Sequence, residues 1–241
     1  MSISLDIPGQ SPYRDSGAPS RDAETAPAPL PSGRGPSAPS PSVGCVIMAS
    51  GLGTRFGGNK LLCNLHGKPL ISHILDTAES VSLFRILTVT RHREVARLCA
   101  QKDVECLLHS LPGQNDTIRL GLLRLLGFPH MAGCLFCPAD QPLVSQESLR
   151  ELFYAFCRSP RQICRLGYGD RTGAPVLFGR RFFPELLSLP PEKGGSFLMK
   201  KYPGQVIVVP ARDEFELYDA DTPKELAALS HILSAGNRRG D

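Results

Sequence analysis

The sequence predicts an α/β protein: a single Rossmann-like domain with a mostly parallel, twisted sheet and helices on both faces. The first observation is a continuous apolar run at residues 43–49, which is typical of a strand buried on both faces. The second is that strand-like and helix-like patterns alternate four times over residues 43–157. Such alternation is typical of βαβ units, whose right-handed crossovers pack helices against a parallel sheet.

The individual elements follow from the spacing of apolar residues. The predicted strands are residues 43–49, 85–90, 104–108 and 133–137, and the predicted helices are residues 71–78, 94–101, 115–126 and 145–157. From residue 161 the pattern becomes irregular, and we expect residues 175–178 and 206–209 to be strands of a lid or a sheet extension. A last helix is expected from about Thr222 to Leu233, with Pro223 in its first turn.

The N-terminal 42 residues differ in composition from the rest of the chain. They contain 22 Pro, Gly or Ser residues and one aromatic residue, Tyr13. Such a segment cannot bury enough apolar surface to offset its chain entropy. We therefore predict a disordered tail at residues 1–42, one folded domain at residues 43–234, and a flexible C-terminus at residues 235–241.

Charge and cysteine usage limit the classes of partner. The formal net charge is +4, and no Lys/Arg run accompanies it. This excess suits a polyanionic small molecule better than a nucleic acid, although a generic basic surface explains it equally well. No apolar run approaches the roughly 20 residues that span a bilayer. Several of the eight cysteines lie in apolar runs, Cys134 and Cys137 among them, so we expect core packing and a reduced, cytoplasmic protein.

A glycine-rich stretch, Gly51–Lys60, directly follows the first predicted strand. Glycines allow backbone amides to approach phosphates, and Arg55 and Lys60 would supply positive charge. The stretch is not a dinucleotide fingerprint, because Phe56 stands where the third glycine is required, and it does not fit a Walker A loop. A glycine-rich surface turn is the structural alternative.

Acidic residues stand at two other places on the same expected edge of the sheet. Asp140 follows the fourth predicted strand, and a carboxylate opposite a triphosphate-binding loop suits a hard divalent cation. Asp219 and Asp221 alternate in an extended segment, so both can face one site. The alternative for Asp140, and for Asp221 or Thr222, is that each caps the helix that follows it.

A further, weaker signal is the segment at residues 112–118, which begins a helix at this edge and contains Gly113 and Thr117. It could contact a base or ribose, and a plain capping turn is the equal alternative.

Together these segments resemble the molybdenum-cofactor cytidylyltransferases, a branch of the nucleotidyltransferase group that also holds the molybdenum-cofactor guanylyltransferases. The motifs that carry the resemblance are Ala49–Lys60, Gly67–Leu70, Asp140–Leu143 and Asp219–Pro223, in the order of the family. Three later stretches are similar to the cytidylyl branch: Gly173–Gly179, Phe183–Leu187 and Glu192–Gly195. The resemblance covers residues 43–230.

The resemblance implies a fold of the nucleotide-diphospho-sugar transferase type and transfer of CMP from CTP to a phosphorylated molybdopterin-type cofactor, with release of pyrophosphate. It implies that Arg55 and Lys60 are catalytic and that Mg²⁺ is held by Asp140, Asp221 and Asp219. The implied nucleotide-binding residues are Ala49, Ser50, Gly51, Gly53, Thr54, Arg55, Lys60 and Asp140. To these we add Gly113 and Thr117, because their segment begins at the same edge of the sheet. We expect a monomer that has no nucleic-acid or membrane partner and that could pass its product to a molybdoenzyme.

The base and the acceptor remain open at this point. Guanylyl transfer, nucleotidyl transfer to a sugar or isoprenoid phosphate, and a non-catalytic molybdenum-cofactor chaperone are the alternatives. The guanylyl branch has Gly at position 50 and the cytidylyl branch usually has Ala. Because Ser50 carries a Cβ atom that would narrow a base pocket, we expect CTP to be preferred over GTP.

Overall fold

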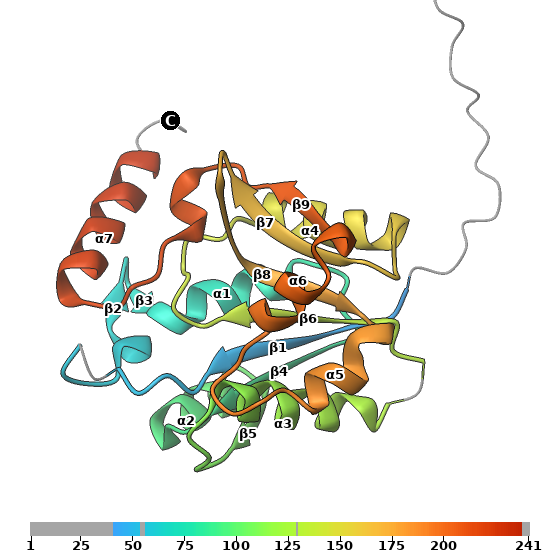
Figure 1. Ribbon diagram of the computed structural model, residues 1–241. Helices are drawn as coiled ribbons and strands as arrows, with labels where there is room; N and C mark the ends of the chain where they lie inside the picture. Colours follow the sequence, from blue (N-terminus) through green and yellow to red (C-terminus); the bar gives the residue numbers. More distant parts are fainter. Residues whose placement is uncertain (1–40, 54–55, 129, 238–241) are drawn as a thin grey trace, which may run out of the picture. The chain divides into compact units, whose positions relative to one another are not determined.

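A seven-stranded sheet forms the middle of the domain, and β1 (Val43–Ala49) lies inside it (Figure 1). The computed structural model describes residues 41–53, 56–128 and 130–237, and all of them belong to one unit, Pro39–Asp241. The strand order is β5 (Glu105–Leu108), β4 (Arg85–Thr90), β1, β6 (Gly133–Pro138), β8 (Arg171–Gly179), β7 (Ile163–Tyr168) and β9 (Val206–Pro210). The first four strands in this order are mutually parallel, and β8 is antiparallel to both of its neighbours.

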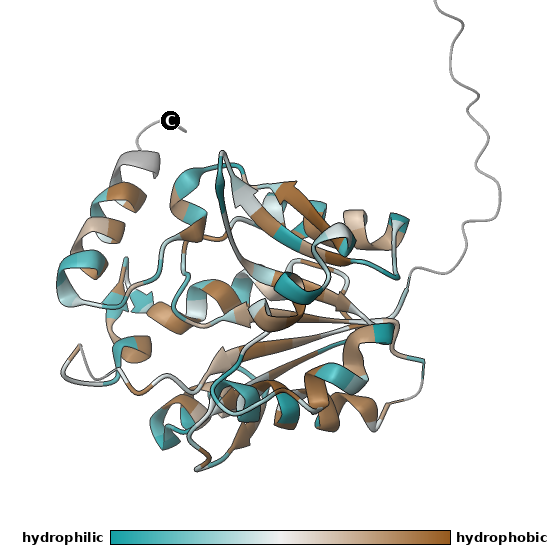
Figure 2. Cartoon of the chain, in the orientation of Figure 1, coloured by the Kyte–Doolittle hydropathy of each residue, from teal (hydrophilic) through white to brown (hydrophobic). Residues whose placement is uncertain are grey.

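Helices cover both faces of the parallel part, as the sequence predicts. Cys45 and Ile47 of β1 belong to the core cluster that contains residues of α1 (Leu70–Glu79), α2 (Arg93–Gln101) and α4 (Gln146–Arg158). Val46, on the opposite face, packs in the cluster that contains Leu122 of α3 (Gln114–Leu126). This division follows from the two-residue period of a strand. Figure 2 shows the resulting hydrophobic strands in the interior of the domain.

Residues after 161 form regular structure, which corrects the irregular pattern expected there. β7 and β8 make an antiparallel pair, with a shift in register between Arg165 and Gly167, and β9 adds a parallel edge strand. The expected sheet extension at residues 175–178 is therefore present, but β8 is longer, and β7 was not predicted. The reason is that Arg165 and Gly167 interrupt the apolar pattern of β7, whose stability comes from its two neighbouring strands.

Smaller elements complete the domain. They are β2 (Asn64–Leu65), β3 (Lys68–Pro69), α5 (Phe183–Leu187), α6 (Ser196–Lys201), α7 (Pro223–Asn237) and the 3₁₀ helices η1 (Lys60–Leu62), η2 (Arg180–Phe182), η3 (Pro203–Gln205) and η4 (Glu214–Leu217). Helix α7 continues past both the predicted helix end at Leu233 and the predicted domain boundary at residue 234. No Pro interrupts the chain there, so nothing forces the helix to stop.

The cysteines behave as the sequence predicts. All eight are free thiols, and Cys134 and Cys137 are fully buried in β6. Burial raises the pKa of both thiols well above the ordinary value, which disfavours the reactive thiolate. Over the described ranges, no helix has both the length and the apolar character needed to cross a membrane.

Candidate active site

The candidate site lies at the carboxyl ends of β1 and β6. The chain builds β1, β4 and β5 outward in one direction and then returns to place β6 on the other side of β1. Ligands of open α/β sheets bind at such a switch point. Ser50 directly follows β1, and Asp140 lies two residues after β6. Ser145 caps α4 by accepting a hydrogen bond from the Ser148 amide at 3.1 Å, so the capping alternative for Asp140 does not hold.

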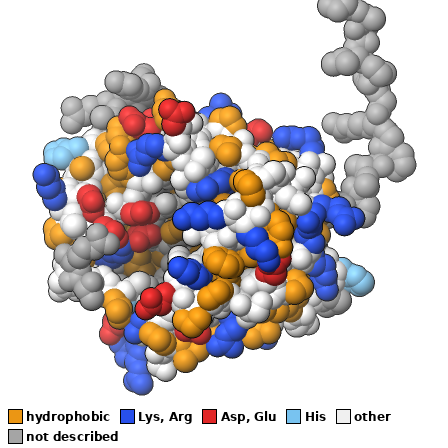
Figure 3. Space-filling view, in the orientation of Figure 1, with side chains coloured by type: hydrophobic (Ala, Val, Ile, Leu, Met, Phe, Trp, Pro, Cys, Tyr) orange, Lys and Arg blue, Asp and Glu red, His pale blue; other side chains and the backbone are white. Residues whose placement is uncertain are grey.

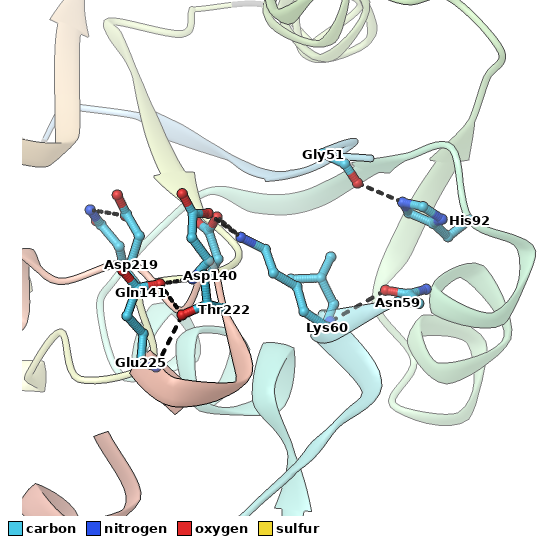
Figure 4. A network of polar contacts seen from close by, with 11 residues as sticks. Gly51, Asn59, Lys60, His92, Asp140, Gln141, Asp219, Thr222 and Glu225 are labelled. Atoms are coloured by element: carbon cyan, nitrogen blue, oxygen red, sulfur yellow. Dashed lines mark hydrogen bonds and ion pairs between the residues drawn. The ribbon is translucent and has the colours of Figure 1, made fainter. Parts of the chain in front are cut away.

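Lys60 is the buried cation of the site, with 7% of its surface exposed. It begins η1, and Asn59 orders this turn by accepting a hydrogen bond from the Leu61 amide at 3.3 Å. Lys60 Nζ donates to Asp140 Oδ2 and to Asp221 Oδ1, each at 2.7 Å (Figure 4). Burial alone would lower the pKa of Lys60, but the two carboxylates outweigh it and raise the pKa above its ordinary value. The ammonium is therefore charged at neutral pH.

The segment that carries Asp221 is fastened beside the end of β6. The Ala220 amide donates to the carbonyl oxygen of Asp140 at 3.0 Å. Thr222 caps α7, since its Oγ1 accepts a hydrogen bond from the Glu225 amide at 3.2 Å. Glu225 Oε2 in turn accepts from the Asp221 amide at 3.0 Å. The capping alternative thus holds for Thr222, whereas the carboxylate of Asp221 reaches Lys60.

Asp219 lies close to this acidic pair but has another partner. Its Oδ1 accepts a hydrogen bond from Gln141 Nε2 at 2.9 Å (Figure 4). Burial and the negative charges of Asp140 and Asp221 raise the pKa of Asp219 above its ordinary value. The three aspartates, predicted from two separate motifs, therefore share one electrostatic environment.

The glycine-rich loop makes a tight turn before Lys60. Gly53 has φ of +60°, and its carbonyl oxygen accepts a hydrogen bond from the Phe56 amide at 2.9 Å. A Cβ atom at Gly53 would lie 2.6 Å from the carbonyl oxygen of Gly58, so this position requires glycine. Thr54 and Arg55, two of the predicted nucleotide-binding residues, lie outside the described residues.

A cavity of about 360 Å³ opens between the loop after β1 and the start of α3. Five of the predicted nucleotide-binding residues line it, namely Ser50, Gly51, Gly113, Thr117 and Asp140. Ala49 does not; it is buried, and its carbonyl oxygen accepts a hydrogen bond from Thr90 Oγ1 at 2.9 Å. Of the ten predicted residues, five therefore line the cavity, and Ala49 lies in the core instead.

The segment at residues 112–118 caps α3 and also lines the cavity. The Gly113 amide donates to Asp116 Oδ2 at 3.1 Å, which caps α3. Thr117 lines the cavity, and its buried Oγ1 has no hydrogen-bond partner among the residues that the structure describes. An unpaired buried hydroxyl costs free energy, which a ligand that hydrogen-bonds to Thr117 would offset.

Two histidines that sequence reasoning left out support the site. His109 Nδ1 accepts a hydrogen bond from the Leu111 amide at 3.2 Å, so the proton of the neutral ring is on Nε2. Nε2 lies 2.8 Å from Ser50 Oγ, which donates to the carbonyl oxygen of Val89 at 3.1 Å. Burial, followed by the positive charge of Arg91, lowers the pKa of His109 below its ordinary value, which favours this neutral form.

The second histidine, His92, has Nε2 at 2.8 Å from the carbonyl oxygen of Gly51 (Figure 4). His92 comes two residues after β4, and His109 comes directly after β5. Both therefore follow strands that end at the same edge of the sheet as β1. Their places just after predicted strands were the signal in the sequence that could have assigned both histidines to the site.

The charges on the surface are unevenly distributed. Asp and Glu side chains gather left of centre in Figure 3, next to a group of Lys and Arg side chains.

A larger and more open hollow, about 820 Å³, lies at the other end of β4 and β5 and is lined by Arg85, Glu105 and Arg124. It contains none of the predicted site residues.

Comparisons with known proteins identify the family. The model of the MobA-like NTP transferase domain matches residues 45–206. Among curated proteins, the purine catabolism protein PucB of Bacillus subtilis is 28% identical over 203 residues, covering 78% of this chain and 96% of PucB. The bifunctional protein GlmU of Clavibacter sepedonicus is 33% identical over 124 residues, which are 48% of this chain and only 25% of GlmU.

The fold is also found in solved structures. Rv0371c of Mycobacterium tuberculosis H37Rv superposes with a TM-score of 0.68 at 22% identity, covering 79% of this chain and 98% of Rv0371c. Its complex with manganese superposes with a TM-score of 0.63 at 20% identity, with the same two coverages. The matched domain, the α/β sheet and the shared length lead to one conclusion. This chain is a nucleotidyltransferase that belongs to the MobA-like NTP transferase domain family.

Proposed function

We propose that this protein transfers CMP from CTP to the phosphate of a molybdopterin-type cofactor, with release of pyrophosphate and with Mg²⁺ as the metal. One observation carries the proposal: Asp140 and Asp221, 81 positions apart, converge on Lys60 beside a cavity at the switch point of the sheet. A protein that only bound a cofactor would need the cavity but not this pair of carboxylates.

The residues present fit a hard divalent cation. Two carboxylate oxygens, from Asp140 and Asp221, already approach a single positive charge at 2.7 Å each. Within the described ranges, no three His, Cys, Asp or Glu side chains form a metal site by themselves. Mg²⁺ is commonly held by one or two carboxylates together with waters and substrate phosphates, so this donor set suits it. The manganese complex of Rv0371c supports a divalent metal in this fold.

The reaction needs positioning and positive charge rather than a protein nucleophile. An oxygen of the acceptor phosphate forms a bond to the α-phosphorus of the nucleotide, and the bond from that phosphorus to the β-phosphate oxygen breaks. The attacking oxygen is already anionic, so no general base is required. Lys60 and Arg55 would stabilise negative charge on the phosphates, and bound Mg²⁺ would supply further charge at the same oxygens.

The choice of CTP rests on Ser50. Its hydroxyl donates to the carbonyl oxygen of Val89 and lies 2.8 Å from His109 Nε2, so we assign the narrowing of the cavity to the Cβ atom of Ser50. A narrower pocket favours a pyrimidine over a purine. GTP in place of CTP, and a sugar or isoprenoid phosphate in place of the pterin, are the alternative outcomes of the test.

The test is a matrix of the four ribonucleotides against candidate acceptors, with pyrophosphate release as the readout. We expect release only with Mg²⁺, with CTP above GTP, and only when a phosphorylated pterin is present. Pyrophosphate release with hexosamine 1-phosphate or an isoprenoid phosphate instead would mean that the acceptor is not a pterin. Tight pterin binding with no turnover of any nucleotide would favour the chaperone.

We further propose a cytoplasmic monomer whose catalytic domain starts at residue 43; residues 1–40 of the tail predicted at residues 1–42 lie outside the described residues. Sedimentation of the full chain tests the monomer, and a pull-down of molybdoenzymes tests transfer of the product to a recipient.

A further inference from the structure

A second cavity, of about 210 Å³, adjoins the nucleotide cavity. The two cavities share Met48, Gln114 and Pro138 in their walls. Apolar side chains of β6, β8 and α6 make up much of the second cavity, including Phe136, Phe178 and Met199. A molecule in this cavity would therefore lie next to a nucleotide in the first.

Two sequence stretches that resemble the cytidylyl branch, but that had no role in the site so far, meet at this cavity. Gly173–Gly179 contributes Gly173, Val176 and Phe178, and Glu192–Gly195 contributes its glycine pair. A Cβ atom at Gly195 would lie 2.9 Å from the ring of Phe178, so glycine is needed to keep this wall in place.

Of the described residues that line the second cavity, Arg165 of β7 is the only one with a charged side chain. It is half-buried, and its Nε donates to the carbonyl oxygen of Gly173 at 3.3 Å. Among the described residues, no carboxylate forms an ion pair with it. A guanidinium has five N–H donors, so donors remain for a ligand. Burying an unpaired charge is costly, and a bound anion would offset that cost.

We infer that this cavity is the acceptor subsite, that its apolar walls take a flat heterocyclic ring, and that Arg165 binds the phosphate which the acceptor carries. This inference rests on the proposed function and adds the residue that selects a phosphorylated acceptor. A planar guanidinium suits phosphate, because two parallel N–H donors match two phosphate oxygens. Arg165 would hold the attacking phosphate in the second cavity, which shares a wall with the nucleotide cavity.

The test measures binding apart from turnover. The probes are 6-hydroxymethylpterin phosphate and its dephosphorylated form, titrated into the full chain by pterin fluorescence. For the wild-type protein we expect the phosphorylated probe to bind about 10-fold more tightly or better, the scale of a charged hydrogen bond. Arg165→Met should abolish this difference, and Arg165→Lys should keep part of it. Arg161→Met, at an exposed arginine just before β7, is the matched control and should bind as wild type does.

A second variant tests the ring pocket. Gly195→Ala should weaken both probes by a similar factor, because its Cβ displaces Phe178 into the cavity. Binding of CTP with Mg²⁺, measured by calorimetry, should be unchanged in Arg165→Met. Equal binding of the phosphorylated probe by wild type and Arg165→Met, or no binding by wild type, would overturn the inference even if CTP binds. Failure of the wild-type protein to bind any nucleotide would instead overturn the proposed function.

Discussion

The Nζ atom of Lys60 lies 2.7 Å from Oδ2 of Asp140, although the two residues are 80 positions apart in the sequence. The same nitrogen binds Asp221, so a lysine ammonium lies between the two carboxylates that we propose as metal ligands. Lys60 and a divalent cation thus compete for the same oxygens. In the complete complex we expect Lys60 to turn to the nucleotide phosphates.

The first prediction concerns this competition. Lys60→Met should bind Mn²⁺ roughly 10-fold more tightly than wild type in the absence of nucleotide, because two carboxylates lose a competing cation. The same variant should use CTP poorly. Electron paramagnetic resonance of free Mn²⁺ measures the affinity, and Lys68→Met, whose partner is Asp76, is the control. Weaker Mn²⁺ binding by Lys60→Met than by wild type contradicts the prediction.

The second prediction concerns the proposed metal ligands. Asp140→Ala and Asp221→Ala should each lower kcat by on the order of 10²-fold or more, the scale of losing one electrostatic stabiliser. Asp219→Asn should be milder, since its contact is with Gln141 rather than with Lys60. Pyrophosphate release measures kcat, and circular dichroism checks the fold. Asp170→Ala, at an exposed turn between β7 and β8, should keep full activity. If both aspartate variants stay active, the metal assignment is wrong.

The third prediction concerns base selection. Ser50→Gly should shift the ratio of kcat/KM for CTP and GTP toward GTP by about 1–3 kcal/mol, the scale of a small steric change in a pocket. Ser50→Ala keeps the Cβ atom and loses only the bonds to Val89 and His109, so it should retain the preference for CTP. A shift of equal size in both variants would assign selection to the hydroxyl instead.

The fourth prediction concerns pH. Because the folded-state pKa of His109 is below its ordinary value of about 6.5, the unfolded chain binds more protons in the window between the two values. The contribution of His109 to stability is therefore complete above about pH 6.5 and is lost as the pH falls through the folded-state pKa. His109→Gln keeps a donor for Ser50 but does not titrate. Its loss of stability relative to wild type should be larger at pH 7.5 than at pH 5.

Urea unfolding at several pH values measures this difference. The pKa of His73 is lowered as well. Because His73 is present in both proteins, its contribution to stability cancels, and the comparison isolates His109. A loss of stability for His109→Gln that is the same at both pH values would contradict the prediction.

The fifth prediction concerns the N-terminal segment. Deleting residues 1–42 should change neither the melting temperature nor turnover, because a chain so rich in Pro, Gly and Ser cannot contribute to a core. Differential scanning calorimetry and the pyrophosphate assay check this. A fall in melting temperature would mean that the segment packs on the domain.

Much of the parallel part of the fold could be predicted from local pattern. The strand at residues 43–49 was predicted with its observed bounds, and the helices at 71–78 and 115–126 were extended by only one or two residues. These segments carry strong apolar periodicity, which depends only on neighbours in the chain. β7 does not, because Arg165 faces a cavity and Gly167 contacts β9, so its pattern makes sense only within the sheet.

The sequence by itself determined the α/β class, the order of the parallel elements and the residue types that a phosphate and metal site needs. Only the tertiary structure decided that Lys60 lies between Asp140 and Asp221, and that Thr222 rather than Asp221 caps the last helix. It also decided that His109 supports Ser50. Periodicity and composition act over a few residues. A hydrogen bond or an ion pair whose two partners are 59 or 161 positions apart in the sequence depends instead on where the sheet brings their backbones.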